Sequence, residues 1–92
     1  MDERALDRAL ESAFGGTAAE RRVVVRQARD LADAEKTETD RDAALTVEEV
    51  IRQLGDAPAD CTLPERWNWW LGALEAAYGG YREFQVRAVE RN

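Results

Sequence analysis

Apolar residues recur every three or four positions in four segments of the chain, a spacing that predicts four amphipathic α-helices. The first three segments are about Glu3–Phe14, about Ala18–Lys36 and about Val47–Leu54. The fourth, about Leu63–Arg91, is predicted to form a continuous helix roughly 40 Å long. The pattern therefore predicts an all-α fold, a small helical bundle in which three shorter helices pack on a long C-terminal helix. The length of 92 residues suits a single helical domain over residues 1–92.

Helix-start signals support three of these segments. Thr17, Thr46 and Thr62 each precede a glutamate three positions later, which is the spacing of a capping box. In that motif the threonine oxygen and the glutamate carboxylate each accept a backbone N–H from the other residue. The Val23–Val25 run favours a strand locally, but the cap before it and the pattern after it favour a helix.

Glycine, proline and polar residues indicate where the helices end. Gly15 and Gly16 follow the first segment, and Gly55 ends the third. The polar stretch 37–43 lacks an apolar period, so we expect an exposed loop there, and a second loop over 56–61. The pair Gly79–Gly80 interrupts the last segment, and each glycine costs about 1 kcal/mol relative to alanine inside a helix. Whether the helix continues through this pair stays open.

Three tryptophans within four positions are the most unusual feature of the last segment. Trp67 and Trp70 fall on one apolar arc and are predicted to lie in the core. Trp69 points roughly 200° away from Trp67 on a helix, so one core face cannot bury both. It lies either against another helix of the same chain or at a subunit interface. Asn68 and Glu75 fall outside both apolar arcs and are expected to face water.

The arc around Trp69 is the candidate interaction surface. It contains a tryptophan, three small residues and a phenylalanine, namely Trp69, Ala73, Ala76, Gly80 and Phe84. Small side chains let a second helix backbone approach closely, and such faces bordered by aromatic residues are common in homodimers. We therefore expect a non-enzymatic protein–protein interaction or homodimerisation module, whose partner is a second copy or another protein.

The charge balance argues against a nucleic-acid partner. The chain has 19 acidic and 13 basic residues, a net charge of −6, and this surface repels phosphate backbones. Arginine accounts for nearly all of the basic residues, and the composition is similar to that of proteins from halophiles. The alternative is a helix-turn-helix-like nucleic-acid-binding regulator, in which the segment at 45–55 would precede a reading helix that begins near Glu65. That helix would offer Arg66 and three tryptophans to a groove, and the connection exceeds the usual three or four residues.

A stripe of arginines on the second segment is the one basic feature. Arg22, Arg26 and Arg29 follow one another at helical spacing. Such a stripe could meet phosphate or an acidic partner. We expect instead a solvated face with Arg26–Asp30 and Arg29–Asp33 pairs.

The sequence offers little for catalysis. It has no histidine and a single cysteine, Cys61, so no disulfide, no paired-cysteine metal site and no histidine base can form within the chain. The carboxylates of Asp40 and Asp42, and of Glu48 and Glu49, could hold a divalent cation weakly, and an enzyme using carboxylate chemistry is a third possibility. We expect these groups to be solvated, with no cofactor and no metal. The acidic start and the lack of a long apolar run predict a cytoplasmic protein without a membrane segment.

Overall fold

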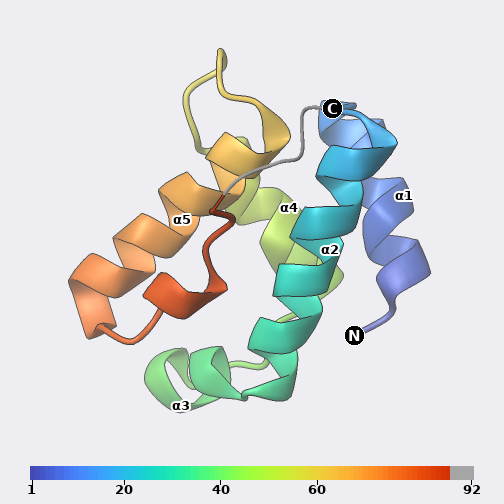
Figure 1. Cartoon of the computed structure of the whole chain (residues 1–92). Helices are drawn as coiled ribbons and strands as arrows, with labels where there is room; N and C mark the ends of the chain where they lie inside the picture. Colours follow the sequence, from blue (N-terminus) through green and yellow to red (C-terminus); the bar gives the residue numbers. More distant parts are fainter. Residues whose placement is uncertain (88–92) are drawn as a thin grey trace.

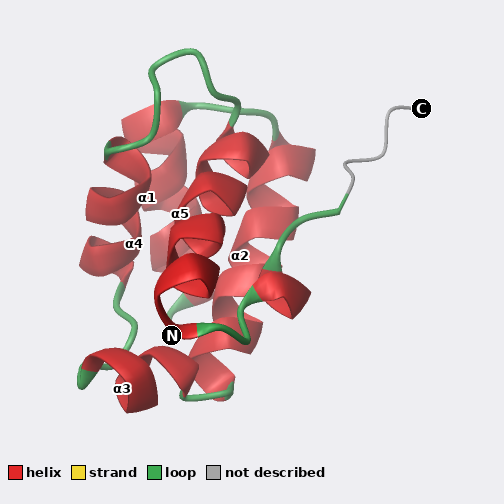
Figure 2. Ribbon diagram, turned by 90° about the vertical axis from the view of Figure 1, so that its left-hand side faces the viewer, coloured by secondary structure: helices red, strands yellow, loops and turns green. Residues whose placement is uncertain are grey.

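The computed structural model describes residues 1–87, and within this range the only regular elements are helices (Figures 1 and 2). The all-α bundle predicted from the sequence is confirmed. Five α-helices follow one another along the chain, with a short 3₁₀ turn, η1, after the last. Their bounds are α1 Glu3–Phe14, α2 Ala18–Asp33, α3 Lys36–Arg41, α4 Val47–Gly55, α5 Leu63–Tyr78 and η1 Arg82–Phe84.

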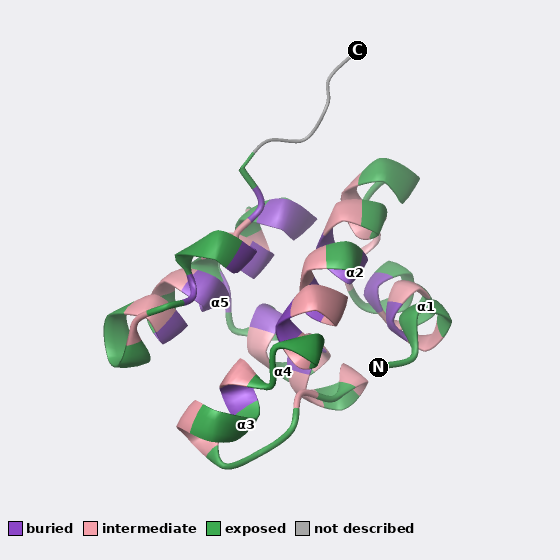
Figure 3. Cartoon of the chain, turned by 60° about the horizontal axis from the view of Figure 1, so that its bottom comes forward, coloured by how far each residue is buried: buried purple, intermediate pink, exposed green. Residues whose placement is uncertain are grey.

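Four of the helices form a closed bundle. Helices α2 and α4 each pack against both α1 and α5, so that α1 and α5 lie on opposite sides of the bundle (Figure 1). The buried residues line the sides of the helices that face one another (Figure 3). They form one continuous core made mostly of leucine, valine and aromatic side chains: Leu6, Leu10, Val24, Val25, Ala28, Leu31, Val50, Leu54, Leu63, Trp67, Trp70, Leu71, Leu74, Tyr81, Phe84 and Val86.

The predicted helix starts are present in the structure. Thr17 and Thr62 form complete capping boxes with Glu20 and Glu65. Thr46 accepts the backbone N–H of the glutamate three residues later, but that carboxylate does not reach back. It binds basic side chains instead, including Arg41 at 3.1 Å. The Val23–Val25 run is helical, as predicted.

The expected exposed loop over 37–43 is wrong, because residues Lys36–Arg41 form α3. Helix α2 ends at Asp33, and Glu35, with a left-handed φ of 55°, changes the direction of the chain before α3. Helix α3 is then held by an ion pair between Lys36 and Asp40 at 2.8 Å, one helical turn apart. Thr37, the second residue of α3, is buried. These contacts stabilise a helix that has no apolar period of its own.

The predicted continuous helix over Leu63–Arg91 is also wrong, because α5 ends at Tyr78. Gly79 has φ 76° and ψ 158°, a combination that only glycine adopts readily, and Gly80 has φ 86°. The Glu75 side chain stabilises this turn, since one carboxylate oxygen accepts the backbone N–H groups of Tyr81 at 2.7 Å and Arg82 at 3.0 Å. The part of the predicted helix at 88–91 lies outside the described residues.

After this turn the chain folds back between α2 and α5. The η1 turn packs against both helices, and the segment that follows runs along α5 (Figure 1). Tyr81, Phe84 and Val86 enter the core from this segment. The C-terminal segment thus completes the core next to α2 and α5. Within residues 1–87, no helix is long and apolar enough to cross a membrane.

Candidate functional site

The tryptophan-rich tetrad Trp67–Trp70 lies in the first half of α5. A capping box stabilises the start of the helix. The Thr62 N–H donates to the Glu65 carboxylate at 2.8 Å, and the Glu65 N–H donates to the Thr62 hydroxyl oxygen at 3.3 Å. Since successive residues of a helix are rotated by about 100°, the four side chains of the tetrad point in different directions. Trp67 and Trp70, three residues apart, lie on nearly the same side of the helix, whereas Asn68 and Trp69 point elsewhere.

Trp67 and Trp70 lie in the core, as the sequence predicts. Trp67 is completely buried, and its indole Nε1–H donates to the backbone oxygen of Phe84 at 2.8 Å. The ring of Trp70 meets that of Trp67 edge to face, with 5.7 Å between the ring centroids, an arrangement that the aromatic quadrupoles favour. Two of the four side chains thus hold the interior together.

Asn68 has a structural role that sequence reasoning missed. It was expected to face water, but its side-chain oxygen accepts the Val86 N–H and its amide nitrogen donates to the Val86 oxygen, both at 2.7 Å. Trp67 and Asn68 therefore bind the backbone of the C-terminal segment with three hydrogen bonds. The partner atoms are backbone atoms of residues 17 and 18 positions away, so the sequence carries no signal that could have revealed the contact.

Trp69 is the one member of the tetrad that the fold leaves exposed. Its exposed fraction is 41%, against 3% or less for the other two tryptophans. Ala73, Ala76 and Ala77 are also exposed, and at about 100° per residue they share the side of α5 that is turned away from the core. We call this surface the outer face of α5: Trp69, Gly72, Ala73, Ala76 and Ala77.

Two residues of the predicted interaction arc do not belong to this face. Gly80 lies beyond the end of α5, where a side chain at this position would meet the Lys36 side chain at 2.8 Å. Phe84 is buried in the core of its own chain. The arc assumed an unbroken helix, and the turn at Gly79 redirects everything that follows. Trp69, Ala73 and Ala76 are the members that the structure brings together.

Polar groups beside the outer face are already engaged within the chain. The Glu65 carboxylate caps α5, and that of Glu75 binds the turn after it, which lowers the pKa of Glu75. The Arg66 guanidinium donates to the backbone oxygens of Leu54 at 3.1 Å and Ala59 at 3.4 Å, and it lies over the Phe14 ring. The outer face is therefore apolar, and the charged side chains beside it form hydrogen bonds within their own chain.

A second polar cluster joins α3 to the C-terminal segment. The buried Tyr81 hydroxyl donates to Asp40 at 3.0 Å, and the Lys36 ammonium donates to the same carboxylate oxygen at 2.8 Å. The hydrogen bond from Lys36, together with that from Tyr81, lowers the pKa of Asp40. Burial, together with the neighbouring carboxylate, raises the pKa of Tyr81 well above 10.0.

These shifts predict stability losses at both ends of the pH scale. Because the folded pKa of Asp40 is lowered, its contribution is complete above the ordinary value of 3.8 and is lost as the pH falls through the lowered value. Because the folded pKa of Tyr81 is raised, its contribution is complete below 10.0 and is lost as the pH rises above that value. We expect Tyr81→Phe to cost about 1 kcal/mol at neutral pH and to flatten the alkaline decline. Urea denaturation against pH measures both effects.

The matched control for this pH prediction is Tyr78→Phe, since Tyr78 is an exposed tyrosine near the end of α5. It should leave the stability and its alkaline decline close to those of the parent chain. An alkaline decline that is equally steep in parent and Tyr81→Phe chains would contradict the assignment.

Two of the carboxylates singled out in the sequence are bound by other side chains of the same chain. Asp40 is bound to Lys36 and Tyr81, and Glu49 contacts Arg41, Arg52 and Gln53. Within residues 1–87, no three groups of metal-binding type lie close enough together to hold an ion. Cys61 is a free, partly exposed thiol in the loop before α5.

The connection between α4 and α5 spans residues 56–62, longer than the three or four residues usual in a helix-turn-helix unit. Arg66, the basic residue that a reading helix would offer, instead donates to the backbone oxygens of Leu54 in α4 and of Ala59 in this connection.

Comparison with known proteins gives one match. The sequence pattern of the family described as the WNWW domain matches residues 1–75. No curated protein and no solved structure matches the chain. The four letters of the family description are the residues of the tetrad, Trp67, Asn68, Trp69 and Trp70. Because the match covers most of the chain and includes the tetrad, this chain belongs to the WNWW domain family.

Proposed function

We propose that this domain is a non-enzymatic interaction module that pairs with a second copy of itself through the outer face of α5. The observation that carries the proposal is the exposure of Trp69. Trp67, Asn68 and Trp70 all make contacts that hold the domain together, whereas Trp69 leaves 41% of its surface accessible. Burying a large apolar side chain contributes about 1.5–3 kcal/mol. A partner that covers the exposed part of Trp69 would therefore stabilise the complex.

The shape of the outer face suits pairing with an identical copy. One large side chain, Trp69, is followed by the small side chains of Ala73 and Ala76, about 6 Å and 10 Å further along the helix axis. In an antiparallel arrangement about a two-fold axis, each tryptophan would pack over the alanines of the partner helix. Such an interface is self-complementary, as two-fold dimers require.

The charges around the face favour an apolar contact. Burying an unpaired charge would cost several kcal/mol, but Glu65, Arg66 and Glu75 are each hydrogen-bonded within their own chain. Because the Arg66 guanidinium already donates to backbone oxygens, it is less available to bind phosphate, and nucleic-acid binding by α5 has less support. One helix face buries less than the roughly 800 Å² per partner of a standard interface, so we expect a weak dimer with a Kd on the order of 100 µM.

Sedimentation velocity across a concentration series tests the proposal. We expect the parent chain to shift from monomer toward dimer between about 10 µM and about 1 mM, and Trp69→Ala to remain monomeric throughout. Ala73→Glu should also remain monomeric, because it places like charges face to face across the two-fold axis.

Tyr78→Ala is the matched control for these variants, since it removes an aromatic side chain with a similar exposed fraction, 48%, from another side of the same helix. It should dimerise like the parent chain. A parent chain that stays monomeric over the whole series, or equal association by Trp69→Ala, would refute the dimer.

A further inference from the structure

The surface formed by α1 and α2 carries a groove of about 520 Å³ in which basic side chains outnumber acidic ones. Ala18 and Val25 contribute apolar atoms to its lining. The charged residues that line it are two acids of α1 and four arginines of α2: Glu3, Asp7, Arg21, Arg22, Arg26 and Arg29. None of the residues that line this groove belongs to α5, so it is separate from the surface proposed above for pairing.

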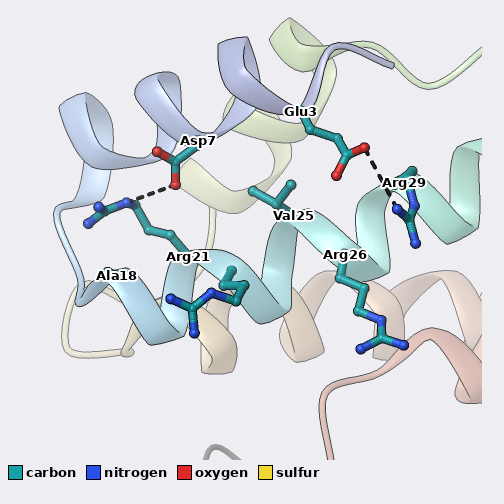
Figure 4. A pocket seen from close by; sticks show the side chains of 8 residues that line it. Glu3, Asp7, Ala18, Arg21, Val25, Arg26 and Arg29 are labelled. Atoms are coloured by element: carbon teal, nitrogen blue, oxygen red, sulfur yellow. Dashed lines mark hydrogen bonds and ion pairs between the residues drawn. The ribbon is translucent and has the colours of Figure 1, made fainter.

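Two of the four arginines are neutralised by α1. The Arg21 Nε atom lies 3.0 Å from the Asp7 carboxylate, and an Arg29 nitrogen lies 3.8 Å from that of Glu3 (Figure 4). Arg29 also contacts Asp30 at 3.4 Å. The expected Arg26–Asp30 and Arg29–Asp33 pairs are wrong for the part of the chain that the structure describes. Arg29 contacts Glu3 and Asp30 instead of Asp33, and the Arg26 side chain makes no ion pair there.

Arg22 and Arg26 remain without an ion pair among residues 1–87, and both are exposed. Figure 4 shows the Arg26 side chain extending away from α1 at the rim of the groove. The groove therefore holds two uncompensated positive charges on a chain whose net charge is −6. Among the charged residues that line the groove, Arg22 and Arg26 are thus the two arginines that no carboxylate of residues 1–87 neutralises.

We propose that Arg22 and Arg26 bind the carboxylates of an acidic segment of a partner protein. The two residues are one helical turn apart, about 6 Å along the axis. Carboxylates at alternate positions of an extended segment are about 6.6 Å apart, so one carboxylate can meet each guanidinium. Each guanidinium group can bind a carboxylate with two hydrogen bonds. The side chain of the intervening residue would point away from the groove.

A short acidic segment fits this surface better than a nucleic acid does. A long polyanion would meet the net negative field of the whole molecule. On its other side, Arg26 also borders a second groove, which is lined by Asp30 and Glu83 among others. The same groove is also lined by Arg87, so its two carboxylates balance its two arginines. It therefore offers no net positive charge to a polyanion that continued past Arg26, whereas a segment of a few residues can stay within the first groove.

The test is a titration of the full chain, labelled with ¹⁵N and carrying Trp69→Ala so that self-association does not interfere, at about 20 mM salt. The probe is a capped hexapeptide of alternating aspartate and valine. We expect amide signals around residues 21–29 to shift and the shifts to vanish in about 1 M salt. Arg22→Gln/Arg26→Gln should weaken binding at least about tenfold. Arg22→Lys/Arg26→Lys keeps the charges but loses the planar guanidinium groups, so its affinity for the peptide should lie between those of the parent chain and the Gln variant.

Arg4 and Arg8 provide the matched control, because they are also exposed and one turn apart but do not line the groove. Arg4→Gln/Arg8→Gln should bind the peptide within about twofold of the parent affinity. Three outcomes would overturn the proposal. The first is that no amide signal of α2 shifts when the peptide is added. The second is that Arg4→Gln/Arg8→Gln loses as much affinity as Arg22→Gln/Arg26→Gln. The third is that a single-stranded DNA oligonucleotide binds more tightly than the peptide, which would point to a nucleic-acid surface instead.

Discussion

Trp67→Ala is expected to lower the free energy of unfolding by about 3–5 kcal/mol, the usual cost of removing a large aromatic side chain from a core. The change leaves a cavity where a fully buried indole packed against Trp70, and it removes the hydrogen bond to the Phe84 oxygen. For a domain of this size we expect the melting temperature to fall by roughly 15–30 °C. Urea denaturation at a concentration where the chain is monomeric measures the effect without a contribution from association.

Trp69→Ala is the control for this prediction, since it removes the same side chain two residues away. Because Trp69 lies on the outer face of α5, we expect its removal to change the unfolding free energy of the monomer by no more than about 0.5 kcal/mol. Comparable losses in the two variants would mean that Trp69 belongs to the core, and the distinction between the tryptophans would fail.

Asn68→Ala is expected to cost about 2 kcal/mol, because it removes both hydrogen bonds that hold the Val86 backbone to α5. Much of this loss should be local, since the C-terminal segment can detach while the helices stay packed. We therefore expect hydrogen exchange at the Val86 amide to accelerate strongly, with little change in α1. Asn68→Asp keeps the acceptor for the Val86 N–H but loses the donor to its carbonyl, and its effect should be smaller.

Gln53→Ala is the control for the loss of an amide side chain. Gln53 donates to Glu49 within α4, at 2.8 Å, and such a pair contributes about 0.2–0.5 kcal/mol. If Asn68→Ala destabilises the domain no more than Gln53→Ala does, or if the Val86 amide remains as protected as in the parent chain, the role of Asn68 in holding the C-terminal segment is wrong.

Local signals were sufficient to predict where the main helices begin. The threonine–glutamate pairs at Thr17 and Thr62 act over three residues, and the caps they form in the structure are complete. The core positions of Trp67 and Trp70 followed from helical periodicity, which depends only on the residues of one helix. Features of this kind are encoded within one or two turns of chain, so the sequence alone reveals them.

Other features depend on contacts between distant residues, and these the sequence did not reveal. Helix α3 forms where no apolar period exists, and the Tyr81–Asp40 hydrogen bond that joins it to the C-terminal segment spans 41 positions. The turn after α5 depends on the Glu75 carboxylate as well as on Gly79 and Gly80. For the candidate site, periodicity separated Trp69 from the other tryptophans, but the break in the helix removed Gly80 and Phe84 from the predicted arc.

The chemical shifts of the three tryptophan indole N–H groups, followed by NMR over a dilution series, test the central claim most directly. The Trp67 N–H is buried and hydrogen-bonded, and the Trp70 ring is enclosed in the core, whereas Trp69 is open to solvent. If Trp69 is the contact between two copies, its indole signal should move with protein concentration while the other two stay in place. A Trp69 signal that does not change from micromolar to millimolar concentration would contradict the account.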